Sequence, residues 1–143
     1  MSKKILIVDD ELDMITFISE ILEDSGYTSI SAKDGEEGLN LLRKEKPDLV
    51  LLDLMMPKKS GITMFQELRN DPDLSHIPVV IVTGISDVTG VDFRNHMYKQ
   101  PLRDEKKFIE TTGLTKYTIP DGYLEKPFDP DALIKAVKEA LKE

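Results

Sequence analysis

Residues 48–61 read Asp-Leu-Val-Leu-Leu-Asp-Leu-Met-Met-Pro-Lys-Lys-Ser-Gly, an apolar run that ends in a carboxylate and is followed by two turn residues. The run Leu49 to Leu52, bounded in this way, is typical of a strand buried on both faces of a parallel sheet. Asp53 would then stand at the carboxyl rim of an open α/β sheet, where ligands bind. A lone aspartate in this position more often only caps a turn, so the other strand ends have to decide between the two interpretations.

The composition indicates one soluble globular domain. The chain has 143 residues, of which 40% are hydrophobic and 32% charged, enough for a real core. A net charge of −8 and a pI near 4.8 argue against partners such as nucleic acid or an anionic membrane. Cysteine is absent, which excludes disulfides and thiolate chemistry. The apolar run Ile5 to Val8 is too short for a signal peptide or a membrane span, so we expect a cytoplasmic protein.

Short apolar runs alternate with segments of helical spacing along the chain. The predicted strands are residues 5–8, 28–32, 49–53, 79–82 and 122–125. The predicted helices follow residues 11, 34, 61 and 129, with Phe17 in the inward stripe of the first and Leu41 on the inward face of the second. In the last of these, Asp129 is a natural N-cap and Pro130 fits the first helical position. This alternation implies right-handed βαβ units, hence one α/β domain over residues 1–143 with a parallel sheet and helices on both faces.

Polar residues stand at the carboxyl ends of these strands: Asp9, Asp10, Asp53, Thr83 and Lys126. In a doubly wound sheet of order 2-1-3-4-5 the crevice lies between strands 1 and 3, which would bring the three aspartates together. Carboxylates this close repel unless a cation joins them, and Mg²⁺ or another divalent cation suits such oxygen ligands. A lysine can hold an anionic oxygen, and a threonine hydroxyl adds a hydrogen bond.

A carboxylate, a metal, an ammonium and a hydroxyl around one crevice predict a phosphoryl-transfer site. The carboxylate would be the nucleophile and would form an aspartyl phosphate. The metal and the lysine would neutralise charge on the transferring oxygens. Simpler interpretations exist for each residue. Asp9 and Asp10 could cap the first helix, Thr83 could be an ordinary strand residue, and Lys126 could be a solvated charge.

Four motifs at the strand ends together resemble the receiver domain of bacterial two-component response regulators, the CheY-like group. They are Ile-Leu-Ile-Val-Asp-Asp-Glu at 5–11, Asp-Leu-Met-Met-Pro at 53–57 with Gly61, Val-Thr-Gly at 82–84, and Glu-Lys-Pro-Phe at 125–128. The resemblance implies a flavodoxin-like, doubly wound five-stranded parallel sheet of order 2-1-3-4-5. It also implies a phosphorylation-dependent signalling switch that acts through protein–protein contacts, with a sensor histidine kinase or histidine phosphotransfer protein as its partner.

The resemblance also implies roles for particular residues. Asp53 would accept the phosphoryl group from a phosphohistidine. Asp10 would bind Mg²⁺ directly, Asp9 through water, and Met55 through its backbone carbonyl. Lys126 would pair with the phosphoryl group.

Two further residues would carry the signal outwards. The resemblance implies that Thr83 swings to bond the phosphoryl group and that Tyr123 moves inward with it. A half-buried strand tyrosine without such a role is the alternative for Tyr123. The peptide bond between Lys126 and Pro127 would be cis, which costs far less before proline than elsewhere.

The chain departs from the family pattern between its fourth and fifth strands. Residues 85–121 form a connection about twice as long as this family usually has, and long loops without structure are uncommon. We expect two short helices joined at Pro101 and an irregular approach to the last strand. Because related receivers often dimerise or meet partners in this region, the sequence leaves the oligomeric state and the output protein open.

Two other functions fit parts of the pattern. A metal-dependent phosphatase can use an aspartyl nucleophile, but such enzymes usually carry an acid–base carboxylate two residues further on, where this chain has Met55. We therefore expect no turnover of external substrates. A receiver-shaped interaction module that ignores phosphorylation is the other alternative, and the presence of every site residue argues against it.

Overall fold

The computed structural model describes residues 3–53, 61–83 and 121–143, and in them the predicted sheet is confirmed. Five strands pair in the order β2-β1-β3-β4-β5, and every neighbouring pair is parallel. The strands are β1 (Lys4–Val8), β2 (Thr28–Ala32), β3 (Leu49–Asp53), β4 (Val79–Thr83) and β5 (Gly122–Glu125). The fold is therefore the doubly wound α/β class that the sequence indicated.

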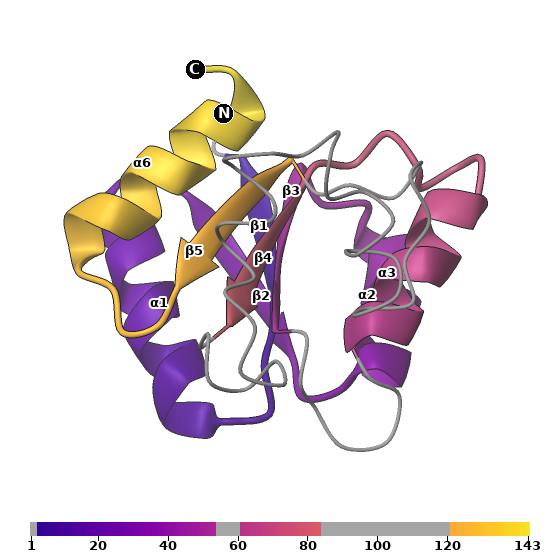
Figure 1. The fold of residues 1–143 in the computed structure, drawn as a ribbon, viewed down its shortest axis with the longest axis horizontal. Helices are drawn as coiled ribbons and strands as arrows, with labels where there is room; N and C mark the ends of the chain where they lie inside the picture. The colour runs from indigo at the N-terminus through magenta and orange to yellow at the C-terminus, as the bar shows by residue number, and fades with distance from the viewer. Residues whose placement is uncertain (1–2, 54–60, 84–120) are drawn as a thin grey trace, which may run out of the picture.

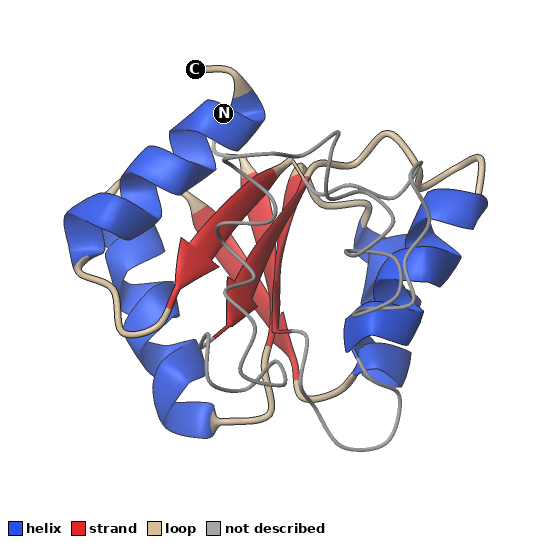
Figure 2. Ribbon diagram, viewed as in Figure 1, coloured by secondary structure: helices blue, strands red, loops and turns tan. Residues whose placement is uncertain are grey.

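Helices cover both faces of this sheet (Figures 1 and 2). They are α1 (Leu12–Asp24), α2 (Gly35–Glu45), α3 (Gly61–Asn70) and α6 (Pro130–Leu141). Helices α1 and α6 pack on one face, whereas α2 and α3 pack on the other (Figure 1). The carboxyl ends of the parallel strands therefore meet at one edge of a three-layered domain.

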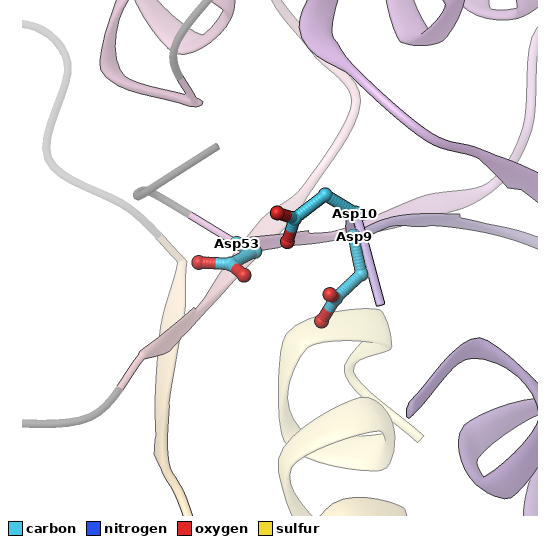
Figure 3. A group of neighbouring side chains, drawn as sticks. All are labelled: Asp9, Asp10 and Asp53. Carbon is cyan, nitrogen blue, oxygen red and sulfur yellow. The ribbon is translucent and has the colours of Figure 1, made fainter. Parts of the chain in front are cut away.

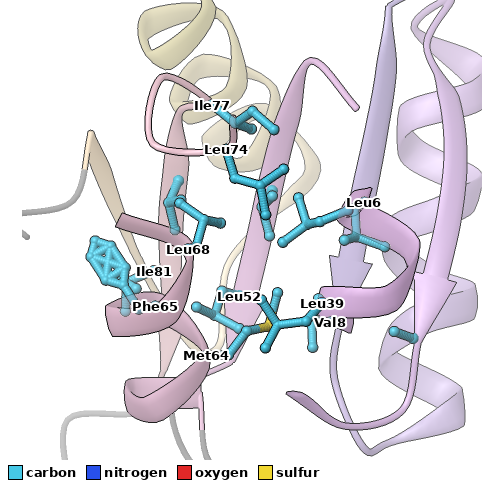
Figure 4. Close-up of a cluster of buried hydrophobic side chains, with 14 of the residues drawn as sticks. Leu6, Val8, Leu39, Leu52, Met64, Phe65, Leu68, Leu74, Ile77 and Ile81 are labelled. Carbon is cyan, nitrogen blue, oxygen red and sulfur yellow. The ribbon is translucent and has the colours of Figure 1, made fainter. Parts of the chain in front are cut away.

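The two faces of the sheet bury separate hydrophobic clusters. Leu6 and Val8 of β1 point into the cluster beneath α2 and α3, together with Met64 and Phe65 of α3 (Figure 4). Alternate residues of the same strand, such as Ile5, belong to the cluster beneath α1 and α6. Since both faces of the central strands are buried, these strands have no polar alternation, which explains their continuous apolar runs.

Two details of the helix faces differ from the prediction. The inward stripe of α1 was expected to include Phe17, but this side chain is 39% exposed and Ile15 is buried instead. Phe17 lies at the margin of the stripe, where its ring packs 5.9 Å from that of Phe128. In α2, Leu39 is fully buried whereas the expected Leu41 is only partly so. Where the apolar stripe of a helix is wider than its buried face, spacing alone does not show which residues at the margin of the stripe are buried.

The predicted start of the last helix is confirmed. The Asp129 carboxylate accepts a hydrogen bond of 2.8 Å from the Ala132 N–H, and Pro130 opens α6. Two other predictions lie outside the described residues: the two short helices expected within 85–121, and the backbone carbonyl of Met55.

Candidate functional site at the carboxyl edge of the sheet

Three carboxylates meet where β1 and β3 end. Asp9 and Asp10 directly follow β1, and Asp53 is the last residue of β3. Because the two strands are neighbours, with Val8 paired to Leu52, one oxygen of each aspartate lies within 4.8 Å of the others (Figure 3). The structure thus brings together the three acids that the sequence analysis expected in one crevice.

The three aspartates differ in burial and support. Asp9 and Asp53 are 2% and 5% exposed, whereas Asp10 is exposed to solvent. Asp9 is held in place from two sides, because its N–H donates to the Ala32 carbonyl at 3.1 Å and its Oδ1 accepts from the Glu11 N–H at 2.9 Å. The site therefore has two buried inner carboxylates and one outer carboxylate open to water.

Lys126, which directly follows β5, reaches across to the two inner carboxylates. Its Nζ donates to Asp9 Oδ2 at 3.2 Å and to Asp53 Oδ2 at 3.4 Å. Partial burial by itself lowers the pKa of the Lys126 ammonium, but the charges and hydrogen bonds of Asp53 and Asp9 outweigh it and raise the pKa above its usual value. The lysine therefore stays protonated at neutral pH.

Among the residues that the structure describes, carboxylates outnumber cations in this group, which makes it suitable for a metal ion. In that part of the chain one ammonium, that of Lys126, faces the three carboxylates of Asp9, Asp10 and Asp53 and leaves an excess of negative charge. Clustered carboxylate oxygens are hard ligands that favour a divalent cation such as Mg²⁺, which keeps several waters when protein ligands are few. The donor set therefore fits Mg²⁺, with Asp10 on the side open to solvent.

The remaining expected residues lie on β4 and β5. Thr83 ends β4, opposite Glu125 in the parallel register, and only its backbone is described. Tyr123 is 7% exposed and belongs to the hydrophobic cluster beneath α2 and α3, so it is more buried than a half-exposed strand tyrosine. The peptide bond between Lys126 and Pro127 is cis, as the resemblance implied.

Comparison with known proteins gives the class of this chain. The family model of the response regulator receiver domain matches residues 5–97. The polar-differentiation response regulator DivK of Brucella anthropi is 31% identical over 142 residues, which cover 99% of this chain and 98% of DivK. The chain belongs to the family of response regulator receiver domains, the signalling switches of two-component systems.

The chain is also similar to longer transcriptional regulators and to a solved chemotaxis regulator. The alkaline phosphatase synthesis transcriptional regulatory protein PhoP of Bacillus subtilis is 37% identical over 142 residues, covering 99% of this chain and 50% of PhoP. The chain thus spans about half the length of PhoP and of the probable transcriptional regulators ycf27 that it also matches. The structure of the chemotaxis response regulator CheY4 of Vibrio cholerae agrees with a TM-score of 0.73 at 24% identity, covering 98% of this chain and 99% of CheY4, and supports the fold alone. None of the described helices has the length and apolar character needed to cross a bilayer.

Some side-chain contacts at both edges of the sheet were not predicted from the sequence. Lys126 was expected at the same crevice as the three acids and lies there, but its particular hydrogen bond to Asp9 had no signal in the sequence. Arg69 and Asp121 were not singled out either, although they form an ion pair of 2.6 Å at the opposite edge of the sheet. Asp48 and Asp121 both follow a proline and immediately precede a strand, a repeated pattern that could have drawn attention to them.

Proposed function

We propose that Asp53 is the phosphoacceptor of this receiver domain and that its phosphoryl group comes from a histidine kinase or a histidine phosphotransfer protein. The observation that carries the proposal is the position of Asp53 at the end of β3, within 4.8 Å of two further carboxylates and 3.4 Å from the Lys126 ammonium. An ionised carboxylate beside a metal-binding cluster and a fixed cation has the parts that phosphoryl transfer requires.

The transfer follows from these groups. An Asp53 carboxylate oxygen attacks the phosphorus of the phosphohistidine and forms the new O–P bond while the P–N bond breaks. The electron pair of that bond leaves with the imidazole nitrogen of the donor. A general base is not needed, because the nucleophile is already an anion. Lys126, held at this place by Asp9, faces the oxygens of the transferred group.

Asp9, Asp10 and Asp53 would hold Mg²⁺, with the backbone carbonyl of Met55 as a fourth protein ligand. A bound divalent cation neutralises negative charge on the transferring phosphoryl oxygens. The chain supplies the carboxylates that bind it, and the fixed position of Asp9 pre-organises the inner side of the site. Loss of any of these carboxylates should therefore weaken metal binding and phosphorylation together.

The phosphoryl group would act as a switch through its charge. Its oxygens offer new acceptors beside Thr83, and a two-state shift of Thr83 and Tyr123 would change the surface seen by a protein partner. With a net charge of −8, the chain is better suited to protein partners than to nucleic acid. Residues 1–143 would form one receiver domain that works in the cytoplasm, where kinases draw their phosphoryl groups from ATP.

We expect the protein not to turn over external substrates. An aspartyl phosphatase needs an acid–base group close to its nucleophile, and the side chain two residues after Asp53 is the thioether of Met55. The protein would therefore support only its own phosphorylation and dephosphorylation. Repeated hydrolysis of a small phosphate ester in the presence of Mg²⁺ would contradict this part.

The test is incubation of the chain with a small phosphodonor such as phosphoramidate, followed by intact-mass measurement. We expect one added phosphoryl group with Mg²⁺, none with EDTA, and none in Asp53→Asn. Asp13→Asn, the same change in the first turn of α1, is the matched control and should be phosphorylated like the wild type. An unmodified wild-type protein under these conditions would favour a module that ignores phosphorylation.

A further inference from the structure

At the edge of the sheet opposite the carboxylates, β5 begins beside an aspartate that makes two hydrogen bonds to the backbone of β4. Asp121 immediately precedes β5, and its N–H donates to the Val79 carbonyl at 2.9 Å. Its carboxylate Oδ2 accepts the Val79 N–H, also at 2.9 Å. Both backbone groups of one β4 residue are thereby engaged by one residue of the incoming chain, which sets the register at which β5 starts.

Arg69 at the end of α3 fixes this aspartate. Its Nη2 donates to Asp121 Oδ2 at 2.6 Å, and its Nη1 donates to the carbonyls of Ser75 and Ile77 at 2.9 Å each. The guanidinium also lies 5.1 Å from the ring centroid of Phe65, and the side chain is only 11% exposed. Arg69, Asp121 and Val79 together are called the register clamp below.

The position of Lys126 depends on where β5 lies, because the lysine follows this strand directly. The strand is four residues long, and in the described part of the chain it stands at the end of the sheet with β4 as its neighbour. Lys126 directly follows its last residue. A shift of register by one residue would exchange the two faces of the strand, on which Tyr123 and Leu124 are buried in different clusters. If the start of β5 became less fixed, the position of the Lys126 ammonium would therefore change.

Asp48 provides an internal comparison. It immediately precedes β3, where its N–H donates to the Lys4 carbonyl at 2.7 Å and its Oδ2 accepts the Lys4 N–H at 2.8 Å. The bonding is the same as at Asp121, but β3 lies between β1 and β4 and all five of its residues are buried. Two ladders and a full core fix β3, so it should depend far less on its aspartate than β5 does.

We propose that the register clamp positions Lys126 for phosphoryl transfer, with Asp121 and Arg69 as positioning residues that act through the lysine from the far edge of the sheet. This inference rests on the proposed function of Asp53 and adds two residues to it. Neither residue touches the reacting atoms. They act by fixing where the short strand begins, and thereby where the ammonium at its end can lie.

The clamp is tested by a double-mutant cycle on the rate of phosphorylation by phosphoramidate at saturating Mg²⁺. Asp121→Ala should slow phosphorylation on the order of tenfold, which lies within the hundredfold that misplacement by an ångström can cost. In a Lys126→Ala background the same change should have no further effect. Asp121→Asn keeps an oxygen that can accept the Val79 N–H and should recover part of the rate. Asp48→Ala is the control and should leave the rate within about twofold of the wild type.

Two other measurements distinguish a displaced Lys126 from a general loss of structure at the site. The Mg²⁺ affinity of Asp121→Ala should equal that of the wild type, since the three carboxylates lie on β1 and β3, while amide hydrogen exchange at Glu125 should become faster. An equal slowing in the Lys126→Ala background, or an unchanged rate in Asp121→Ala, would overturn the proposal. If the wild type takes no phosphoryl group, the proposed function fails. In that case hydrogen exchange alone tests whether the register clamp fixes the start of β5. Unchanged protection of the Glu125 amide in Asp121→Ala would refute the clamp.

Discussion

Replacing Asp10 by asparagine should stabilise the metal-free protein. Its carboxylate lies within 4.8 Å of those of Asp9 and Asp53, and two unit charges at that distance repel by about 3.5 kcal/mol at an effective dielectric constant near 20. Asp10 is exposed, so water screens it and each repulsion falls towards about 0.9 kcal/mol. After subtraction of the lost attraction to Lys126, the net gain should be about 1 kcal/mol, or roughly 3 °C in the melting temperature.

Mg²⁺ should reverse this order of stabilities. A ligand at one hundred times its Kd stabilises the folded state by about 2.7 kcal/mol, and the wild type should gain this amount. Asp10→Asn lacks the proposed outer metal ligand and should gain far less, so the wild type should become the more stable of the two. The measurement is urea unfolding followed by circular dichroism, in EDTA and again in excess Mg²⁺.

Asp13→Asn is the control for charge alone. Asp13 lies in the first turn of α1, where removal of a carboxylate costs about 0.3–1 kcal/mol, and this variant should keep the full gain from Mg²⁺. Repulsion and metal binding at Asp10 are contradicted if Asp10→Asn is less stable than the wild type in EDTA, or if it gains as much from Mg²⁺ as the wild type does.

Three further predictions concern stability. Burial and the hydrogen bond to Glu143 raise the pKa of Tyr27 to about 12, so this contribution to stability is complete below pH ~10 and is lost as the pH rises towards 12. Unfolding measured across that window should show the loss in the wild type but not in Tyr27→Phe. Leu42→Ala, in the core, should lower the free energy of unfolding by about 2–5 kcal/mol, whereas Leu12→Ala, 73% exposed, should change it by less than about 0.5 kcal/mol. Asp129→Ala removes the N-cap of α6 and should cost about 1 kcal/mol in the same assay, and an unchanged midpoint would contradict the capping role.

Most of the fold could be predicted because the strands are buried on both faces. A strand such as Leu49–Asp53 then appears as an uninterrupted apolar run with a charge at its end. Strand order followed from resemblance rather than from the apolar pattern, and the position of Phe17 could not be decided from spacing. A residue at the margin of a helical stripe can turn towards the core or towards solvent, and its neighbours in space determine which.

The candidate site was predictable only in part. Asp9, Asp10 and Asp53 could be grouped because each ends a strand and parallel strands end at one edge. The pairing of Arg69 with Asp121 had no such signal, since it joins residues 52 positions apart from different elements at the other edge. Side-chain contacts of this kind depend on how elements pack and leave no period in the sequence.

Whether Asp53 receives the phosphoryl group is decided by locating the modification in the chain. The protein is treated with phosphoramidate and Mg²⁺ and then with borohydride, which reduces an aspartyl phosphate to homoserine, and the peptides are analysed by mass spectrometry. We expect homoserine at position 53 alone. Homoserine at Asp9 or Asp10, or its absence from position 53 in a protein that has gained a phosphoryl group, would contradict the claim.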